Sequence, residues 1–484
     1  SLLNITIPDS VISIGDNPFY NTPWLEERRK ENPLVIVNGH LIDGQTASGD
    51  VQIPDSVQYI CGFCFHRCKT ITSVLIPEGI VSIDSYAFGD CTELKRIEIP
   101  HSVTSIGQEA FLGTQWLEER RKENPLVIVN GILIDGKAAE GDIQIPDNVK
   151  HIGIYSFRRC KTITSITLLD SVKSIGSYAF DGCDSLSSVV LSDSVIRIND
   201  HAFCECRNLL SITLPNSIIS IEASTFSNCC NLSNIIIPEG VTTIESCAFC
   251  GCSSLSSIVI PDSVININSY AFKGTPWFEE RKKENPLVIV NGILIDGKAA
   301  EGDIQIPDNV KHICDNCFFE CDNITSVIIP DNVVSIGKNA FMSCKMLGKV
   351  RLSNSITVIE RSAFRKCISL SSIVIPDSVT SIEISAFENC THLLNVTIPD
   401  SVVKIGQFAF KNTLWLCKQI SKSKEETYLK NINNLSKQII EDGSMKIAVY
   451  NLINMMPILS FEIRNYILLR IIYLKDTNVY GLFH

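Results

Sequence analysis

The stretch LSSIVIPDSVTSIEISAFENC, residues 370–390, decides the fold, because close variants of it recur along most of the 484-residue chain. Its proline, Pro376, serves as the reference position of the repeat. The equivalent position recurs from Pro8 to Pro399 at intervals of 23 or 46 residues, and the register never slips. Self-similarity at one fixed period predicts a solenoid, in which each repeat forms a coil that stacks on its neighbours.

Two columns of apolar side chains are fixed relative to the reference position. Six residues on, all fifteen copies carry isoleucine, and eleven residues on, all fifteen carry phenylalanine. We expect each column to form an inward spine, for which burial gives roughly 8–12 kcal/mol gross per coil. Most of this offsets the chain entropy of ordering the coil, so one coil alone should not fold. Members of the two columns are Ile14, Ile60, Ile106, Ile244 and Ile405, and Phe19, Phe65, Phe111, Phe249 and Phe410.

Each coil is expected to begin with a short strand that the proline ends. In IVIP (373–376) apolar residues alternate inward and outward, and proline cannot donate to a further ladder bond. Strands stacked in this way would form one long parallel sheet, and the residues around the phenylalanine would form a single helical turn. The pattern L-x-x-I-x-I-P-x-S-V-x-x-I-G-x-x-A-F-x-x-C, as at 94–114 and 370–390, resembles the BspA-type leucine-rich repeats. The resemblance implies a β-rich leucine-rich-repeat solenoid, a right-handed superhelix, and it supplies no catalytic residues.

Special blocks replace one coil wherever the interval is 46. They span residues 23–44, 115–136 and 276–297, and each begins with a charged segment such as PWLEERRKEN. This segment predicts a short helix, and the VIV and ILI segments around Asn-Gly that follow predict a hairpin. Two interpretations stay open: the blocks are inserted display elements that protrude, or they are alternative coils with an outer helix where the superhelix changes curvature.

The expected domain organisation is a solenoid over residues 1–413, which starts in the middle of a repeat, and a divergent segment over 414–484. Trp415 stands where a fourth block would begin, but after it the composition shifts to Lys, Asn and Ile. The role of residues 414–484 is unknown. No run of 18 uncharged apolar residues occurs, so no membrane span is expected.

The cysteines invite a metal or disulfide interpretation, but their placement favours packing. Eleven of the 20 occupy one column, fourteen residues after the reference position, where four copies carry threonine instead. Small side chains in one column indicate a buried tight corner with mostly free thiols. The C-x2-C-x3-C segments at Cys61–Cys68 and Cys314–Cys321 lack the second facing pair that zinc sites usually have. No metal and no cofactor are therefore expected.

Composition and motifs exclude several classes of function. The net charge of −11 disfavours nucleic acid and anionic membrane surfaces as partners. No G-x-S-x-G, phosphate-binding glycine loop or H-E-x-x-H occurs, so the chain is not expected to be an enzyme. We find no row of aromatic residues for stacking on sugar rings, which disfavours carbohydrate as the ligand.

The outward face of the strands is the candidate binding surface, although apolar residues there also suit simple β-propensity. One hypothesis is a cell-surface or secreted adhesion scaffold that binds a protein, on a host or on a neighbouring cell. The other is a structural spacer, without its own ligand, between an N-terminal domain and an anchor. The candidate surface residues are Leu75, Val190, Ile236, Val259, Ile328, Arg351 and Val374.

Overall fold

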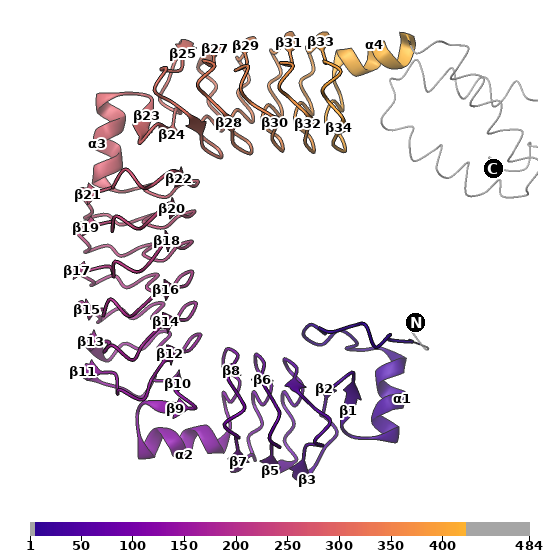
Figure 1. The fold of residues 1–484 in the computed structure, drawn as a ribbon, viewed down its shortest axis with the longest axis vertical. Coiled ribbons are helices and arrows are strands. Elements are labelled where there is room, and N and C mark those ends of the chain that lie inside the picture. The colour runs from indigo at the N-terminus through magenta and orange to yellow at the C-terminus, as the bar shows by residue number, and fades with distance from the viewer. Residues whose placement is uncertain (1–4, 423–484) are drawn as a thin grey trace, which may run out of the picture. The chain divides into compact units, whose positions relative to one another are not determined.

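The computed structural model describes residues 5–422, so most of the expected segment 414–484 lies outside the described residues. It shows a leucine-rich-repeat β-solenoid with about 16 turns of ~23 residues and few helices (Figure 1). The chain divides into two units, Ser1–Glu280 and Arg281–His484, and each is described by itself. The four helices of the described residues are α1 (Pro23–Glu31), α2 (Gln115–Glu123), α3 (Pro276–Glu284) and α4 (Leu414–Lys422).

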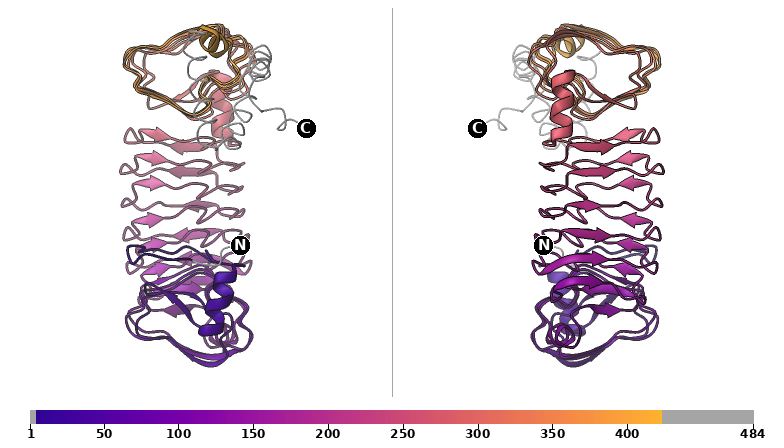
Figure 2. Two further views of the ribbon diagram at one scale, coloured as in Figure 1. Left: turned by 90° about the vertical axis from the view of Figure 1, so that its right-hand side faces the viewer. Right: turned by 90° about the vertical axis from the view of Figure 1, so that its left-hand side faces the viewer.

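The coils contribute strands to two rows. Within each row, strands of neighbouring coils pair in parallel (Figure 2). The first row, before the reference position, comprises β3 (Gly49–Gln52), β5 (Ile71–Leu75), β7 (Arg96–Glu98), β11 (Gly141–Gln144), β13 (Ile163–Thr167), β15 (Ser188–Val190), β17 (Ser211–Ile212), β19 (Asn234–Ile236) and β21 (Ser257–Val259) in the N-terminal unit. In the second unit it comprises β25 (Gly302–Gln305), β27 (Ile324–Ile328), β29 (Lys349–Arg351), β31 (Ser372–Val374) and β33 (Asn395–Thr397).

The second row is built from shorter strands that contain the isoleucine column. In the N-terminal unit these are β4 (Tyr59–Ile60), β6 (Ser82–Ile83), β8 (Ser105–Ile106), β12 (His151–Ile152), β14 (Ser174–Ile175), β16 (Arg197–Ile198), β18 (Ser220–Ile221), β20 (Thr243–Ile244) and β22 (Asn266–Ile267). In the second unit they are β26 (His312–Ile313), β28 (Ser335–Ile336), β30 (Val358–Ile359), β32 (Ser381–Ile382) and β34 (Lys404–Ile405). The prediction of one long parallel sheet is therefore wrong, because the strands form two rows and each row divides into several sheets, at the blocks and also between ordinary coils, as between β17 and β19.

Each block contains a helix and an antiparallel strand pair. The pairs are β1 (Val35–Val37) with β2 (His40–Asp43), β9 (Val127–Val129) with β10 (Ile132–Asp135), and β23 (Val288–Val290) with β24 (Ile293–Asp296). Between β9 and β10, Asn130 and Gly131 both have positive φ, which suits the Asn-Gly turn of a tight hairpin. The second strand of each pair then continues in parallel into the next coil, as β10 does with β12.

The expected helical turn around the phenylalanine is a series of tight turns instead. In one coil Tyr86 and Asp90 both have positive φ, and residues in that conformation cannot continue a right-handed helix. The backbone N–H of Tyr86 donates to Gln108 of the next coil, whereas the N–H of Ala87 donates to Asp84 of its own coil. Backbone hydrogen bonds to the next coil therefore join neighbouring coils at this turn as well as at the strands.

The predicted spines are buried in nearly every coil. Phe65 and Phe88 stack with ring centroids 5.1 Å apart, and stacking of the same kind continues from Phe157 to Phe272 and from Phe318 to Phe410. Of the column members named from sequence, Ile60, Ile106, Ile244, Phe65, Phe111, Phe249 and Phe410 are buried.

The prediction of burial is wrong at the two ends of the described coils. Ile405 is 52% exposed, and Ile14 and Phe19 are only half-buried. These residues belong to the last and the first coil of residues 5–422, so no described coil covers their outer side.

Candidate binding surface

Strand geometry places the candidate surface residues in the solvent. In β19 the side chain of Ile235 points into the core, whereas Asn234 and Ile236 on either side of it point outward. The same alternation exposes all six apolar candidates, with exposed fractions between 41% and 67%. Arg351 is also exposed, and its guanidinium lies 3.6 Å from the carboxylate of Asp331.

The structure brings only some of these residues together. Ile236 and Val259 are direct neighbours across the β19–β21 pair, and Val190 lies on β15 of the same series of coils. We call Val190, Ile236 and Val259 the sheet-face patch. Val190 is two coils from Ile236, and its partner across the β13–β15 pair is Thr167. The other candidates also have polar neighbours.

Leu75 is flanked by Gln52 and Glu98 on the adjacent strands. Ile328 lies between Gln305 and Arg351, and Val374 lies beside Thr397.

A second row of exposed apolar residues lies four residues after the reference position. Ile196, Ile219 and Ile265 are 61–69% exposed. Ile196 and Ile265 belong to the coils of Val190 and Val259, and Ile219 belongs to the coil between those of Val190 and Ile236. Sequence reasoning missed this row, although a signal existed. The residues stand between the buried positions three and six after the reference, so alternation alone would have predicted that they point outward.

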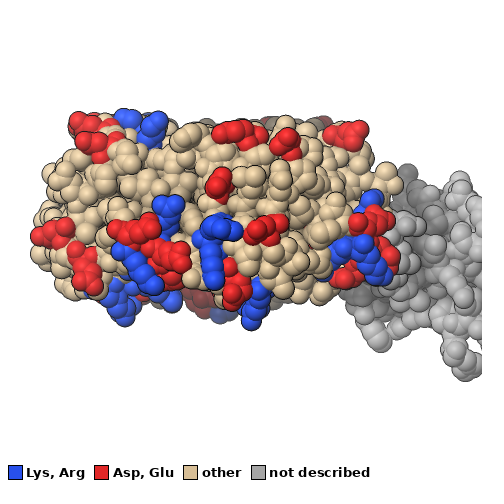
Figure 3. Space-filling model, turned by 90° about the horizontal axis from the view of Figure 1, so that it is seen from below, with Lys and Arg blue, Asp and Glu red and all other residues tan. Residues whose placement is uncertain are grey.

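Polar groups on the strand face bind one another across neighbouring coils. Asp142, on β11, accepts hydrogen bonds from Ser165 at 2.6 Å and from Thr164 at 2.9 Å. These bonds lower the pKa of the Asp142 carboxyl, and Asp50 and Asp303 show the same arrangement and the same direction of pKa shift. Acidic and basic residues are interspersed on the face seen in Figure 3.

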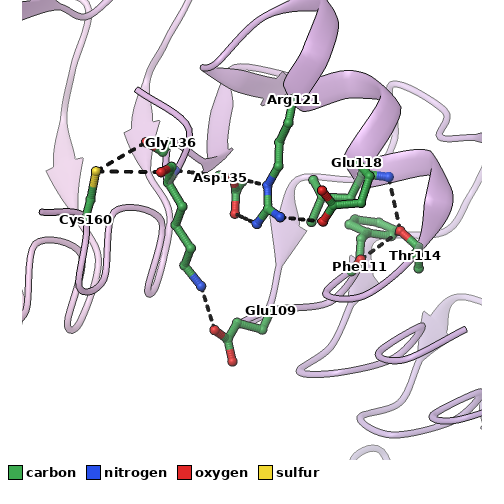
Figure 4. A network of polar contacts seen from close by, with 10 residues as sticks. Glu109, Phe111, Thr114, Glu118, Arg121, Asp135, Gly136 and Cys160 are labelled. Carbon is green, nitrogen blue, oxygen red and sulfur yellow. Dashed lines mark hydrogen bonds and ion pairs between the residues drawn. The ribbon is translucent and has the colours of Figure 1, made fainter. Parts of the chain in front are cut away.

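A network of ion pairs ties each of the first two blocks together. In the second block, Arg121 binds both carboxylate oxygens of Asp135, at 2.8 and 2.7 Å, and Glu118 at 2.6 Å (Figure 4). The side chains of Arg121 and Asp135 are only 17% and 6% exposed, and the Asp135 hydrogen bonds raise the pKa of the Arg121 guanidinium. Arg29 and Asp43 form the same bidentate pair in the first block.

The blocks fit onto the phenylalanine stacks at both of their ends. Thr114 accepts a hydrogen bond from the Leu117 N–H at 3.1 Å and thereby caps α2. The ring of Trp116, the second residue of the block, packs on Phe111 with centroids 4.8 Å apart. At the other end, a Cβ on Gly136 would lie 2.2 Å from the ring of Phe157, so only glycine fits there.

The cysteine column is a structural feature of the core. The Cys91 thiol donates a hydrogen bond to the Phe65 carbonyl of the preceding coil at 2.9 Å, and burial raises its pKa to about 12. Cys206 and Phe180 repeat this contact at 3.1 Å. Within residues 5–422 no group of three or more His, Cys, Asp or Glu side chains is arranged to hold a metal ion. Because burial raises their pKa, the thiols of Cys91 and Cys206 stay protonated at neutral pH.

Aromatic residues do line up, contrary to the expectation from sequence. Nine residues after the reference position, Tyr178 packs edge-to-face with Tyr155, at 5.1 Å between centroids, and stacks on His201 at 4.3 Å. The Arg158 guanidinium lies over the ring of Tyr155, 4.5 Å from its centroid. Neighbouring side chains thus cover much of these rings, which leaves little free ring face for a sugar. The described helices include none long and apolar enough to span a membrane.

Comparison with known proteins supports the architecture. The model of the "BspA type Leucine rich repeat region (6 copies)" matches residues 44–125, 140–229, 173–282, 301–417 and 357–467. A search of curated proteins gave no match.

Among solved structures, the chain is similar to a leucine rich cell surface protein from Faecalibacterium prausnitzii, with 28% identity, 71% of this chain and 86% of that chain covered, and a TM-score of 0.35. It is also similar to a leucine-rich repeat protein from Bacteroides ovatus, with 25% identity, 76% and 88% covered, and a TM-score of 0.31. Both TM-scores are low, so the assignment rests on the sequence match to the family, which extends over more than half of the chain. The chain therefore belongs to the BspA-type leucine-rich-repeat family.

Proposed function

We propose that this chain is a non-catalytic scaffold that binds a protein partner through the sheet-face patch, on the surface of a cell or after secretion. The BspA-type family is non-catalytic. The partner would be a protein on a host or on a neighbouring cell. The cell-surface location is supported by the name of the similar protein from Faecalibacterium prausnitzii.

The observation that carries the proposal is the exposure of Ile236 and Val259 side by side on one face. Contiguous exposed apolar side chains are costly in a monomer and commonly mark an interaction surface. The second row (Ile196, Ile219 and Ile265) adds exposed apolar side chains to the stretch of coils from Val190 to Val259. A spacer needs none of these side chains to be apolar.

The burial of Trp116 and Leu117 and the ion pairs of Arg121 favour the interpretation of the blocks as alternative coils rather than protruding display elements. We also propose that the solenoid spans residues 1–413 and that a segment of different sequence, 414–484, follows it. A block that shares the core adds length to the solenoid. This is the feature that favours the second candidate function, a structural spacer.

The test is adhesion of beads that carry the chain to cultured cells. The triple variant Val190→Glu, Ile236→Glu, Val259→Glu should lose most of the adhesion, because three buried charges would oppose the contact. Thr397→Glu, at an exposed position of the same row in the other unit, is the control and should adhere like the unmodified chain. Unchanged adhesion of a folded triple variant would contradict the binding proposal and favour the structural spacer.

A further inference from the structure

One turn of the N-terminal unit carries two thiols that do not belong to the cysteine column. Cys252 is the column member of this coil, and it is buried and donates a hydrogen bond to the Phe226 carbonyl at 3.0 Å. Cys247 and Cys250 stand nine and twelve residues after the reference position and are half-buried. Only this copy of the fifteen has cysteine at both positions. We call Cys247 and Cys250 the turn pair.

The backbone of the turn sets the two cysteines at disulfide distance. The Cys250 N–H donates to the Cys247 carbonyl at 3.0 Å. A turn closed in this way brings the Cα atoms of its first and fourth residues within about 7 Å, the upper limit for a disulfide. Both neighbouring coils hold the turn, since the Cys247 N–H donates to Ser269 at 3.1 Å and the Cys250 carbonyl accepts from the Asn228 N–H at 2.7 Å. Closing a disulfide therefore needs rotation of two side chains and no movement of the turn.

Side chains at these two positions lie against each other in other coils. The Arg158 guanidinium lies over the Tyr155 ring, and the Lys273 amine lies 5.1 Å from the centroid of the Tyr270 ring. The turn pair follows the same arrangement. Burial raises the pKa of the Cys247 thiol, and the neighbouring thiol raises it further through its charge and a hydrogen bond between the two side chains. The two sulfur atoms therefore face each other.

The other two C-x2-C segments are sealed in the core. Cys61 and Cys64 are 1% and 0% exposed, and Cys314 and Cys317 are 8% and 1% exposed. A dissolved reagent cannot reach thiols at such positions. The turn pair differs because both of its thiols are half-buried at the surface.

We propose that the turn pair is a reversible dithiol–disulfide site, oxidised by a low-molecular-weight disulfide such as oxidised glutathione. One thiol loses its proton, and its sulfur attacks the small disulfide, which leaves a mixed disulfide on the chain and releases one glutathione thiolate. The second thiol loses its proton in turn, attacks the chain's own sulfur, closes the Cys247–Cys250 bond and releases the second glutathione thiolate. The chain gives up two electrons and two protons, and one oxidised glutathione becomes two thiols. The site shares no residue with the sheet-face patch and does not depend on the proposed function.

Mass spectrometry of the full chain tests the proposal. The reduced protein is incubated with oxidised glutathione at about pH 8.5, near the pKa of ordinary thiols. It is then alkylated and digested, and the peptides are sequenced by tandem mass spectrometry. The turn pair should be joined and unalkylated, dithiothreitol should restore both thiols, and Cys61 and Cys64 should stay reduced. A turn pair that remains a dithiol, or a link from Cys250 to Cys230 of the preceding coil, overturns the proposal.

Two variants separate the pair from a single reactive thiol. In Cys247→Ser the mixed disulfide of Cys250 with glutathione should accumulate at least about tenfold above its level in the unmodified chain, because no neighbouring thiol displaces it. Cys204→Ser is the matched control. Cys204 is also half-buried and stands twelve residues after its reference position, but its partner nine residues after that position is His201.

The control should form the turn-pair disulfide to within about twofold of the unmodified chain, because Cys204 takes no part in the exchange. Equal amounts of the Cys250 mixed disulfide in the unmodified chain and in Cys247→Ser would show that the two thiols do not react with each other, and would overturn the proposal.

Discussion

At the scale of single residues, the column fourteen positions after the reference takes small side chains that donate a hydrogen bond. Cys91 donates to the Phe65 carbonyl at 2.9 Å, and Thr114 in the same column donates to the Phe111 carbonyl at 2.8 Å. The threonine also caps the following helix, so it replaces cysteine where a block begins. Spacing predicted a buried corner here, but the acceptor of each thiol depends on the stacking of coils and could not be predicted from the sequence.

These thiols should make the fold sensitive to alkali. Burial raises the pKa of Cys91 to about 12, and it raises the pKa of Cys206 as well. Below about pH 8.5 the thiols are protonated in both states, and their contribution to stability is complete. At higher pH the unfolded chain releases protons that the folded chain retains up to about pH 12, so the free energy of unfolding falls as pH rises.

Urea unfolding at pH 7.5 and at pH 10 measures this effect. The midpoint should drop at pH 10, and the drop should be smaller in the double variant Cys91→Ala, Cys206→Ala than in the unmodified chain. The variant should be less stable at pH 7.5, because each alanine leaves a small cavity. The same pH dependence in both proteins would show that the cysteine column does not cause it.

At the scale of elements, the blocks show which features sequence patterns predict and which they do not. The charged helix and the Asn-Gly turn follow from local signals. The pairing of Arg121 with Asp135 does not, because it joins residues 14 positions apart on different elements. The glycine that ends the block is visible in the sequence, but its cause, the ring of Phe157 against Gly136, requires the fold.

The Arg121–Asp135 pair should be a major stabiliser of the second block. Arg121→Ala leaves a buried carboxylate without its bidentate partner and should cost about 3 kcal/mol of unfolding free energy. Arg121→Lys keeps the charge but loses the paired N–H donors that bind both Asp135 oxygens, and should cost about 1 kcal/mol of unfolding free energy. In the third block Lys282 already stands at this position.

Chemical unfolding of the two variants tests the pair, and Lys122→Ala is the control. Lys122 is exposed on the same helix, so its loss should change stability by less than about 0.5 kcal/mol. Equal stability of Arg121→Ala and Lys122→Ala would contradict the structural role of the pair.

At the scale of the whole molecule, one repeating register accounts for most of the structure. Each unit contains its own stack of phenylalanine rings, such as Phe157 to Phe272 in the first and Phe318 to Phe410 in the second. The period of 23 predicted both buried columns, since the identity of those residues depends only on contact with the next coil. The same register places Ile236 and Val259, one period apart, on neighbouring coils, and the structure pairs them across β19 and β21. It does not predict which exposed positions carry apolar residues, because these vary from coil to coil.

Zero-length carbodiimide cross-linking with mass spectrometry tests the stacking of neighbouring coils most directly. Lys345 lies 2.9 Å from Asp322, Lys404 lies 2.8 Å from Glu383, and Lys137 lies 2.7 Å from Glu109. These pairs are separated by 23, 21 and 28 residues, so each joins adjacent coils or a coil and its neighbouring block. We predict that these three links dominate the map. Links from the same lysines mainly to carboxylates two or more periods away would contradict the solenoid.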